Sequence, residues 1–386
     1  MRLAILASHP VQYYGPLYRE LAHRLDLKVF FAHRATPAEQ ARAGFGVDFD
    51  WDVDITTGYD HTFLANRSAN PGTEQFNGCD TPEIGMELDN GRFDALLVHG
   101  WHLKSYVQGV VAAKRCGIPV LVRGDSQLET ARSIGKKVLK AALFPPGLRV
   151  FDAALYVGQR SRAYYAHYRY PEDRLFFSPH CVDNAWFAAR ATPEVRKRAR
   201  ADLAISDTVQ LLLFAGKLIE WKRPTDLIKA VALCRAREQT AEILVAGDGE
   251  LRSTLEGLAQ QSNVPIHMLG FCNQTEMPEA YAAADCLVLP SSNETWGLVA
   301  NEALACGRPI IVSDACGCAA DLTAGETVGR VFPVGEVPAL ATAIGSVAQD
   351  PPRARAIAEV SSAYSLSAAA EGVLAGLNRV VAKTKR

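Results

Sequence analysis

The stretch that decides the fold is LVLPSSNETWGLVANEALACGRPIIVSD, residues 287–314. Its apolar start predicts a buried strand, a polar loop follows, and a helix is expected to begin near Gly297. A second apolar run over 309–313 predicts another strand. A strand, a helix and a strand in this order form the unit from which parallel sheets are built. The stretch therefore predicts an α/β protein.

The same alternation continues in both directions along the chain. In the first half we expect strands over 3–7, 27–32, 95–99, 119–123, 153–157 and 175–178, with helices near 16–25, 103–116, 130–143 and 159–169. In the second half, after a charged helix over 194–202, we expect strands over 209–215, 243–246, 266–269, 286–289, 309–313 and 328–332. This pattern predicts two Rossmann-like, doubly wound domains that face each other across a cleft.

The length of 386 residues exceeds what one hydrophobic core usually serves. We predict an N-terminal domain over 1–184, a linker near 184–194, and a C-terminal domain over 185–362. The Ala-rich end over 351–381 predicts two helices, and residues 363–386 are expected to cross back to the first domain. The long irregular stretch over 34–92 contains several aromatic residues and is expected to shape a binding site.

Composition excludes several classes of protein. With 41 Lys and Arg against 42 Asp and Glu, the net charge of -1 gives no reason to expect a nucleic-acid partner. The apolar run over 3–7 is too short for a signal peptide, and no run has membrane-spanning length. Nine scattered cysteines fit a reducing compartment, and Cys316 and Cys318 have no partners at zinc spacing. We therefore expect a cytoplasmic protein.

Glu294 and Glu302 lie eight residues apart across the expected helix start. The N-terminus of a helix offers unpaired N–H groups, so Gly297 and Leu298 can bind a phosphate or sugar oxygen through the backbone. Carboxylates repel phosphates but accept hydrogen bonds from sugar hydroxyls. Glu302 would then bind a ribose and Glu294 a hexose. The alternative is that both glutamates decorate a solvated helix.

A second segment, LLLFAGKLIEWKRPTDLIKA over 211–230, places Lys217 and Lys222 after an apolar strand. Ligands of open α/β sheets bind beyond the carboxyl ends of the strands, where two ammonium groups can neutralise a diphosphate. A solvated lysine pair is the alternative.

Two turns follow the next strands. The turn at Gly247-Asp248-Gly249 lacks the full dinucleotide fingerprint and is interpreted as a tight turn that exposes backbone toward the ligand. The backbone around Phe271 can pair with the edge of a nucleobase. An ordinary turn, with Asn273 capping the next helix, is the alternative.

Taken together, these segments resemble the donor-binding half of the family-4 retaining glycosyltransferases with the GT-B fold. The resemblance implies that Glu294 contacts the donor sugar, that Glu302 binds the ribose, and that Lys217 and Lys222 hold the diphosphate. Lys217 stands where arginine is commoner. A compact ammonium group therefore replaces a guanidinium group that could donate two parallel hydrogen bonds to a phosphate.

The first half resembles the family less closely. In SHPVQYYGPLYRELAHRL, residues 8–25, only Gly15 remains of a Gly pair that faces the donor phosphates, and His9 and Gln12 are candidates for donor or acceptor contacts. After the strand over 119–123, where many members carry a histidine, this chain has Arg123-Gly124-Asp125. The resemblance makes Asp125 a catalytic candidate, either orienting a sugar hydroxyl or accepting the acceptor proton. Arg123 and His102 are further acceptor-side candidates, and packing is the alternative for His99 and His102.

The resemblance implies transfer with retention of configuration, in which the leaving diphosphate takes the proton of the acceptor. It implies neither a metal nor a cofactor besides the nucleotide-diphosphate sugar substrate, and Asp52 and Asp54 are interpreted as solvated. The basic stretch over 133–151 fits either a plain surface helix or peripheral contact at the inner face of a membrane.

Other functions remain open. The acceptor is a glycan, a lipid-linked molecule or a small molecule, with surface polysaccharide or glycoconjugate synthesis as the expected setting. A nucleotide-sugar 2-epimerase shares the architecture, and a non-catalytic nucleotide-sugar binder is the second alternative.

Overall fold

The computed structural model describes residues 1–36, 49–128 and 144–384. These residues form two compact units. The first contains residues 1–36, 54–180 and 366–384, and the second contains residues 49–53 and 181–365. The division therefore falls after His180 and after Ser365, and the segment 49–53, predicted to lie in the N-terminal domain, belongs to the second unit.

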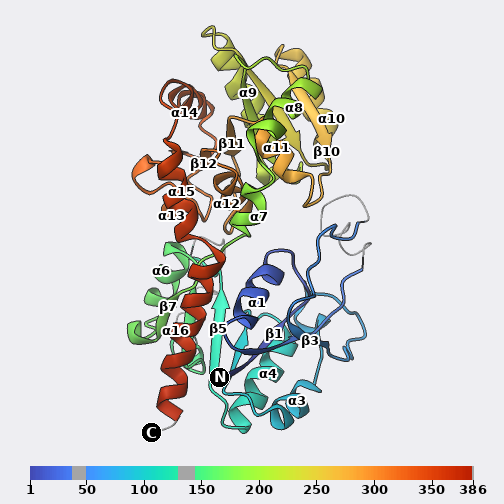
Figure 1. Cartoon of the computed structure of the whole chain (residues 1–386), viewed down its shortest axis with the longest axis vertical. Helices are drawn as coiled ribbons and strands as arrows, with labels where there is room; N and C mark the ends of the chain where they lie inside the picture. Colours follow the sequence, from blue (N-terminus) through green and yellow to red (C-terminus); the bar gives the residue numbers. More distant parts are fainter. Residues whose placement is uncertain (37–48, 129–143, 385–386) are drawn as a thin grey trace. The chain divides into compact units, whose positions relative to one another are not determined.

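The first unit is built on a parallel sheet of seven strands in the order β3-β2-β1-β4-β5-β6-β7 (Figure 1). The strands are β1 (Arg2–Ala7), β2 (Asp26–Phe31), β3 (Asp60–Phe63), β4 (Ala95–Val98), β5 (Val120–Gly124), β6 (Ala153–Tyr156) and β7 (Leu175–Phe177). The central strands are apolar on both faces, as expected for strands that are covered by helices on both sides.

Helices of the first unit are α1 (Tyr14–Ala22), α3 (Ile84–Gly91), α4 (Lys104–Arg115), α6 (Gln159–His167) and α16 (Leu366–Thr384), with the short 3₁₀ helices η2 (Phe76–Gly78) and η3 (Glu172–Arg174). The C-terminal helix α16 packs directly on this sheet. A Cβ atom added at Gly372 would lie 1.8 Å from the carbonyl oxygen of Phe177, and Ser178 Oγ donates to the carbonyl of Ala369 at 2.9 Å. The missing side chain at Gly372 thus permits the close approach of helix and strand.

The second unit contains a parallel sheet of six strands in the order β10-β9-β8-β11-β12-β13. The strands are β8 (Gln210–Ala215), β9 (Ala241–Ala246), β10 (Ile266–Gly270), β11 (Cys286–Leu289), β12 (Ile310–Ser313) and β13 (Gly329–Phe332). The helices are α7 (Asn184–Ala188), α8 (Pro193–Asp202), α9 (Pro224–Arg235), α10 (Arg252–Gln261), α11 (Met277–Ala283), α12 (Leu298–Ala305), α13 (Ala319–Leu322), α14 (Val337–Gln349) and α15 (Ala354–Ala363), with η4 (Glu220–Lys222) and η5 (Ala324–Glu326).

The prediction of two doubly wound parallel sheets is confirmed, and each predicted strand is present with shifts of one or two residues at its ends. Among the described residues of the stretch interpreted as irregular, a strand and a helix were not predicted, besides the short η2. The edge strand β3 has only four residues, three of them polar, and α3 contains Asp89, Asn90 and Gly91, which are weak helix formers. Residues 184–188, expected to be linker, form α7. The helix predicted over 130–143 lies outside the described residues.

Candidate functional site

The order of the strands marks one place in the second unit. The strand order reverses between the neighbours β8 and β11. Strands β9 and β10 are added on the β8 side of the sheet, and strands β12 and β13 are added on the β11 side. Ligands of open α/β sheets bind beyond the carboxyl ends of the strands at such a switch point. Lys217 and Lys222 follow β8, and Glu294 follows β11. Three of the four residues singled out from the sequence therefore belong to the two loops at the switch point.

Backbone hydrogen bonds join these loops to their neighbours. Ser292 N donates to the carbonyl of Trp221 at 2.8 Å, which links the loop after β8 to the loop after β11. Gly317 N donates to the carbonyl of Glu294 at 2.8 Å, which adds the loop after β12. Leu218 N donates to the carbonyl of Asp248 at 2.9 Å, which adds the loop after β9. The carboxyl edge of the sheet is thus one connected surface.

Lys222 and Glu294 are in direct contact. The Nζ atom of Lys222 donates to Oε2 of Glu294, and the side chains are only 19% and 16% exposed. Lys222 is the last residue of η4, and Arg223 then adopts a left-handed conformation that turns the chain into α9. An ammonium group and a carboxylate are therefore held side by side at the switch point, with opposite charges ready to bind a phosphate and a hydroxyl.

Gly297 brings the start of α12 next to this pair. Its φ of +98° is left-handed, which favours glycine, and a Cβ atom at this position would lie 3.3 Å from Cγ of Glu294. Leu298 is the first residue of the helix, whose first N–H groups lack partners within the helix. The helix N-terminus thus adds partial positive charge beside Glu294.

Glu302 lies one turn into α12 and is 2% exposed. The hydroxyl of Tyr281, on α11, donates to Oε2 of Glu302 at 2.6 Å. This bond holds one carboxylate oxygen of Glu302 in place. Tyr281 is a site residue that sequence reasoning missed, because nothing in the pattern YAAAD over 281–285 distinguishes it from a core aromatic residue.

The loops after β9 and β10 complete the edge. A Cβ atom at Gly247, whose φ is +153°, would lie 1.9 Å from the carbonyl oxygen of Gly216, so the two loops touch through bare backbone. Gly247 N donates to the carbonyl of Gly270 at 2.7 Å. This contact brings the Phe271 loop against the same surface.

The loop after β10 is held by the segment 49–53 of the same unit. The Phe49 and Phe271 ring centroids are 4.5 Å apart, and Asn273 Nδ2 donates to the carbonyl of Asp50 at 2.8 Å. Asp52 accepts a hydrogen bond from Thr275 N at 3.1 Å. Asp52 is exposed, as interpreted from the sequence, and it also holds this loop as an acceptor. Asn273 does not cap α11, whose N-cap is Glu276.

The first unit has its own switch point, at β1 and β4. His9 follows β1, and its Nδ1 lies 3.0 Å from Ser8 Oγ. Gln12 is half-buried just before α1. Gly15 lies inside α1, where a Cβ atom would be 2.8 Å from the carbonyl oxygen of Ile55. The absence of a side chain at Gly15 therefore has a packing reason of its own.

A polar cluster lies at the ends of β4 and β5. Arg123 is 2% exposed and donates to the carbonyl of Pro179 at 2.6 Å and to Ser178 Oγ at 3.1 Å. His99 Nε2 lies 2.9 Å from the Tyr18 hydroxyl. Burial, reinforced by Arg123, lowers the pKa of His99 to about 3 and holds that of His180 well below its usual value. Both rings are therefore neutral near pH 7.

Asp125 is the most exposed member of this cluster. Its side chain is 50% exposed and lies 3.9 Å from His180 Nε2. Loss of hydration raises the pKa of Asp125, while Arg123 and His102 act in the opposite direction. Burial lowers the pKa of His102, whose ring packs on Tyr106 at 5.4 Å. The structure thus groups Arg123, Asp125 and His102, and adds His180, which the sequence did not single out.

Among the described residues, no helix is both long and apolar enough to cross a membrane. All nine cysteines are free thiols.

Comparison with known proteins finds similarity to one family in the second unit. Residues 195–362 match the family model described as "Glycosyl transferases group 1". The chain is 29% identical over 263 residues to a D-inositol 3-phosphate glycosyltransferase of Arthrobacter sp. (strain FB24), a match that covers 63% of this chain and 60% of that relative. It is 30% identical over 294 residues to the protein of the same name from Thermomonospora curvata, covering 69% and 66%.

Solved structures agree on the fold. The Anabaena protein HepE, crystallised with UDP, superposes with a TM-score of 0.72 at 16% identity, covering 97% of this chain and 98% of HepE. At this identity the likeness is one of fold, and the fold is GT-B.

Proposed function

We propose that this chain, whose residues 195–362 match the model of the group 1 glycosyltransferases, transfers a sugar with retention of configuration from a nucleotide-diphosphate sugar to an acceptor in glycoconjugate or polysaccharide synthesis. The observation that carries the proposal is the contact of Lys222 with Glu294 at the switch point of the second sheet. A diphosphate needs cationic partners and a sugar needs hydrogen-bond acceptors, and this pair supplies one of each.

In the proposed complex, the diphosphate binds Lys222, Lys217 and the N–H groups at the start of α12. The Glu294 carboxylate then exchanges its ammonium partner for hydroxyls of the transferred sugar. Glu302 accepts hydrogen bonds from the ribose, and the backbone near Gly247 and Phe271 borders the base. The fixed position of Glu302 under the Tyr281 hydroxyl supports this assignment, because a preorganised acceptor loses little entropy on binding.

The reaction proposed for this site breaks the bond between the anomeric carbon and the diphosphate oxygen. The acceptor oxygen forms the new bond on the same face of the sugar, and its proton passes to the departing diphosphate. Negative charge grows on the leaving group, so the lysines and the helix N-terminus lower the barrier by electrostatic stabilisation. Asp125, in the first unit, is proposed to orient an acceptor or sugar hydroxyl.

Calorimetry with UDP-, GDP- and ADP-sugars tests whether the chain binds a donor. Binding of at least one is expected, and slow release of its sugar to water should follow without acceptor. An absence of heat with every donor would overturn the proposal. NMR of the product anomer then distinguishes retention from inversion, and recovery of an epimerised donor would indicate an isomerase.

Variants test the assignment of roles. Glu294→Ala should reduce turnover more than donor binding, whereas Lys222→Ala should weaken both. Lys229→Ala is the matched control, since Lys229 is an exposed lysine on the neighbouring helix α9. If all three variants behave alike, the assignment of Lys222 and Glu294 is wrong.

A further inference from the structure

Residues 49–53, here called the strap, bring two aromatic side chains to the loop after β10. The strap precedes β3 in the chain, yet it belongs to the second unit. Phe49 is the centre of an aromatic cluster, because its ring centroid lies 4.5 Å from that of Phe271 and 4.9 Å from that of Trp51. Phe49 is only 9% exposed, whereas Trp51 and Phe271 are half-buried. The two outer rings therefore keep part of their aromatic surface uncovered.

Hydrogen bonds on both sides of Trp51 fix the strap to this loop. Asn273 Nδ2 donates to the carbonyl of Asp50 at 2.8 Å, and Thr275 N donates to the carboxylate of Asp52 at 3.1 Å. The hydroxyl of Thr275 also donates to Asp52. Because Trp51 lies between these two anchors, its backbone is held at both ends. Its ring is therefore a preorganised surface, which loses little entropy when a ligand packs on it.

The strap is attached at some distance from the proposed diphosphate site. One strand, β9, separates β10 from β8, whose loop carries Lys217 and Lys222. At about 4.8 Å per strand the two loops lie roughly 10 Å apart, a separation that a nucleotide spans between its diphosphate and its base. Asp50 and Asp52 on the strap repel a diphosphate but not a neutral base. Distance and charge thus both favour the base as the part of the nucleotide nearest the strap.

We infer that the nucleobase of the donor stacks on the uncovered aromatic surface of Trp51 and Phe271, an inference that rests on the proposed binding of a nucleotide-diphosphate sugar. Every nucleobase has a flat π-face, and stacking on aromatic side chains adds affinity whatever the base. Backbone groups near Phe271 would still select the base by its edge. Trp51 is then a binding residue that the first half of the sequence contributes to a site otherwise built from the second half.

Calorimetry with UDP, GDP and ADP tests this role, with inorganic pyrophosphate as a probe that lacks a base. Trp51→Ala should weaken binding of the preferred nucleoside diphosphate about fivefold or more, because a stacking face is lost. Pyrophosphate should bind the variant and the parent protein equally. Trp51→Phe keeps an aromatic face and should retain most of the affinity. Unchanged nucleotide affinity in Trp51→Ala, or an equal loss for pyrophosphate, overturns the inference.

Trp186→Ala is the matched control. Trp186 is half-buried in the same unit, and its ring meets that of Phe187 edge-on at 5.0 Å, much as Trp51 meets Phe49 at 4.9 Å. Its removal should cost comparable packing and leave nucleotide affinity unchanged. Urea unfolding of the two variants compares their stability. If Trp186→Ala loses as much nucleotide affinity as Trp51→Ala, the loss comes from destabilisation and the stacking inference is wrong.

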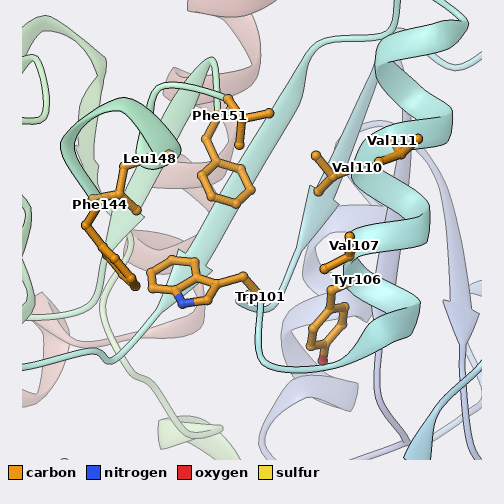
Figure 2. Close-up of a pocket in the computed structure, with 10 residues that line it drawn as sticks. Trp101, Tyr106, Val107, Val110, Val111, Phe144, Leu148 and Phe151 are labelled. Carbon is orange, nitrogen blue, oxygen red and sulfur yellow. The ribbon is translucent and has the colours of Figure 1, made fainter. Parts of the chain in front are cut away.

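Fluorescence supplies a readout that a purely structural role of Trp51 would not move. A stacked base should quench the indole, so the bound nucleotide should dim the parent protein and leave Trp51→Phe unaffected. Trp101→Phe is the control, because Trp101 lies in the first unit, where it lines an apolar groove between α4 and the segment 144–151 (Figure 2). Quenching should persist in that variant. Equal quenching in Trp51→Phe and the parent protein would refute stacking on Trp51.

Binding by the parent protein separates the two ideas. If the parent protein binds none of the nucleoside diphosphates, the proposed donor site and the stacking inference both fail. If it binds one with an affinity that does not depend on Trp51, the donor site stands and only the stacking inference is refuted.

Discussion

The ammonium group of Lys222 contacts the carboxylate of Glu294, although the two residues belong to loops after different strands. Both side chains are largely buried, at 19% and 16% exposed. In the free protein each neutralises the other. When a donor binds, the proposed function gives each a different partner.

The contact should contribute to stability as well. We expect Lys222→Met and Glu294→Gln to be individually destabilising, and the double variant to lose less than their sum, with a coupling energy of about 1 kcal/mol or more. Urea unfolding of the four proteins measures this coupling. Arg355 and Glu359 on α15 are a matched control, because they are 90% and 64% exposed and should couple by only about 0.3–0.5 kcal/mol. Equal coupling energies in the two pairs would show that burial does not strengthen the interaction of Lys222 with Glu294.

Tyr281→Phe removes the hydroxyl that positions Glu302. We expect a loss of about 1–3 kcal/mol in the free energy of unfolding. The KM for the donor should also rise, with a smaller change in kcat, because the ribose contact is made in both the ground state and the transition state.

Tyr170→Phe is the control for this prediction. Tyr170 is also buried and donates to the carbonyl of Phe151 at 2.9 Å, but it lies in the first unit. It should cost similar stability and leave the donor KM unchanged. A donor KM that is the same in Tyr281→Phe and the parent protein would refute the proposed role of Glu302.

Gly247→Ala should be severely destabilising. Its Cβ atom would be 1.9 Å from the carbonyl oxygen of Gly216, and its φ of +153° is one that side chains rarely adopt. Gly257→Ala, in the middle of α10 with open space around it, should instead stabilise by about 0.5–1 kcal/mol. Thermal unfolding distinguishes the two. A folded Gly247→Ala protein of parental stability would contradict the close contact of the two loops.

Burial of the His99 imidazole should make the free energy of unfolding fall as the solution becomes acidic. Its pKa in the folded protein is about 3, below the ordinary value of 6.5, so between these pH values the unfolded chain binds more protons. The contribution of His99 is therefore lost as pH falls from about 6.5, with a slope approaching 1.4 kcal/mol per pH unit.

His99→Asn should flatten this dependence. Urea unfolding at pH 7 and pH 5 measures it, and His23→Asn, at an exposed position, is the control. If the loss between the two pH values is the same in His99→Asn and the parent protein, the buried imidazole is not its source.

The sequence by itself determined the two parallel sheets, because strands that are buried on both faces appear as apolar runs separated by helical patterns. It also placed Lys217, Lys222 and Glu294 after their strands, since loops at the carboxyl ends follow directly from the strand boundaries. What it missed, β3 and α3, are short elements with polar residues whose stability comes from the neighbours on which they pack.

Only the tertiary structure decided which side chains meet. The contact of Lys222 with Glu294, the bond from Tyr281 to Glu302 and the docking of Phe49 on Phe271 join residues that are distant in the chain. The apolar groove likewise needs α4 and the segment 144–151 to lie side by side. Periodicity records which face of an element is buried. Strand order and packing determine what that face touches. Each contact depends on the relative position of two segments, and the local sequence of either segment does not specify that position.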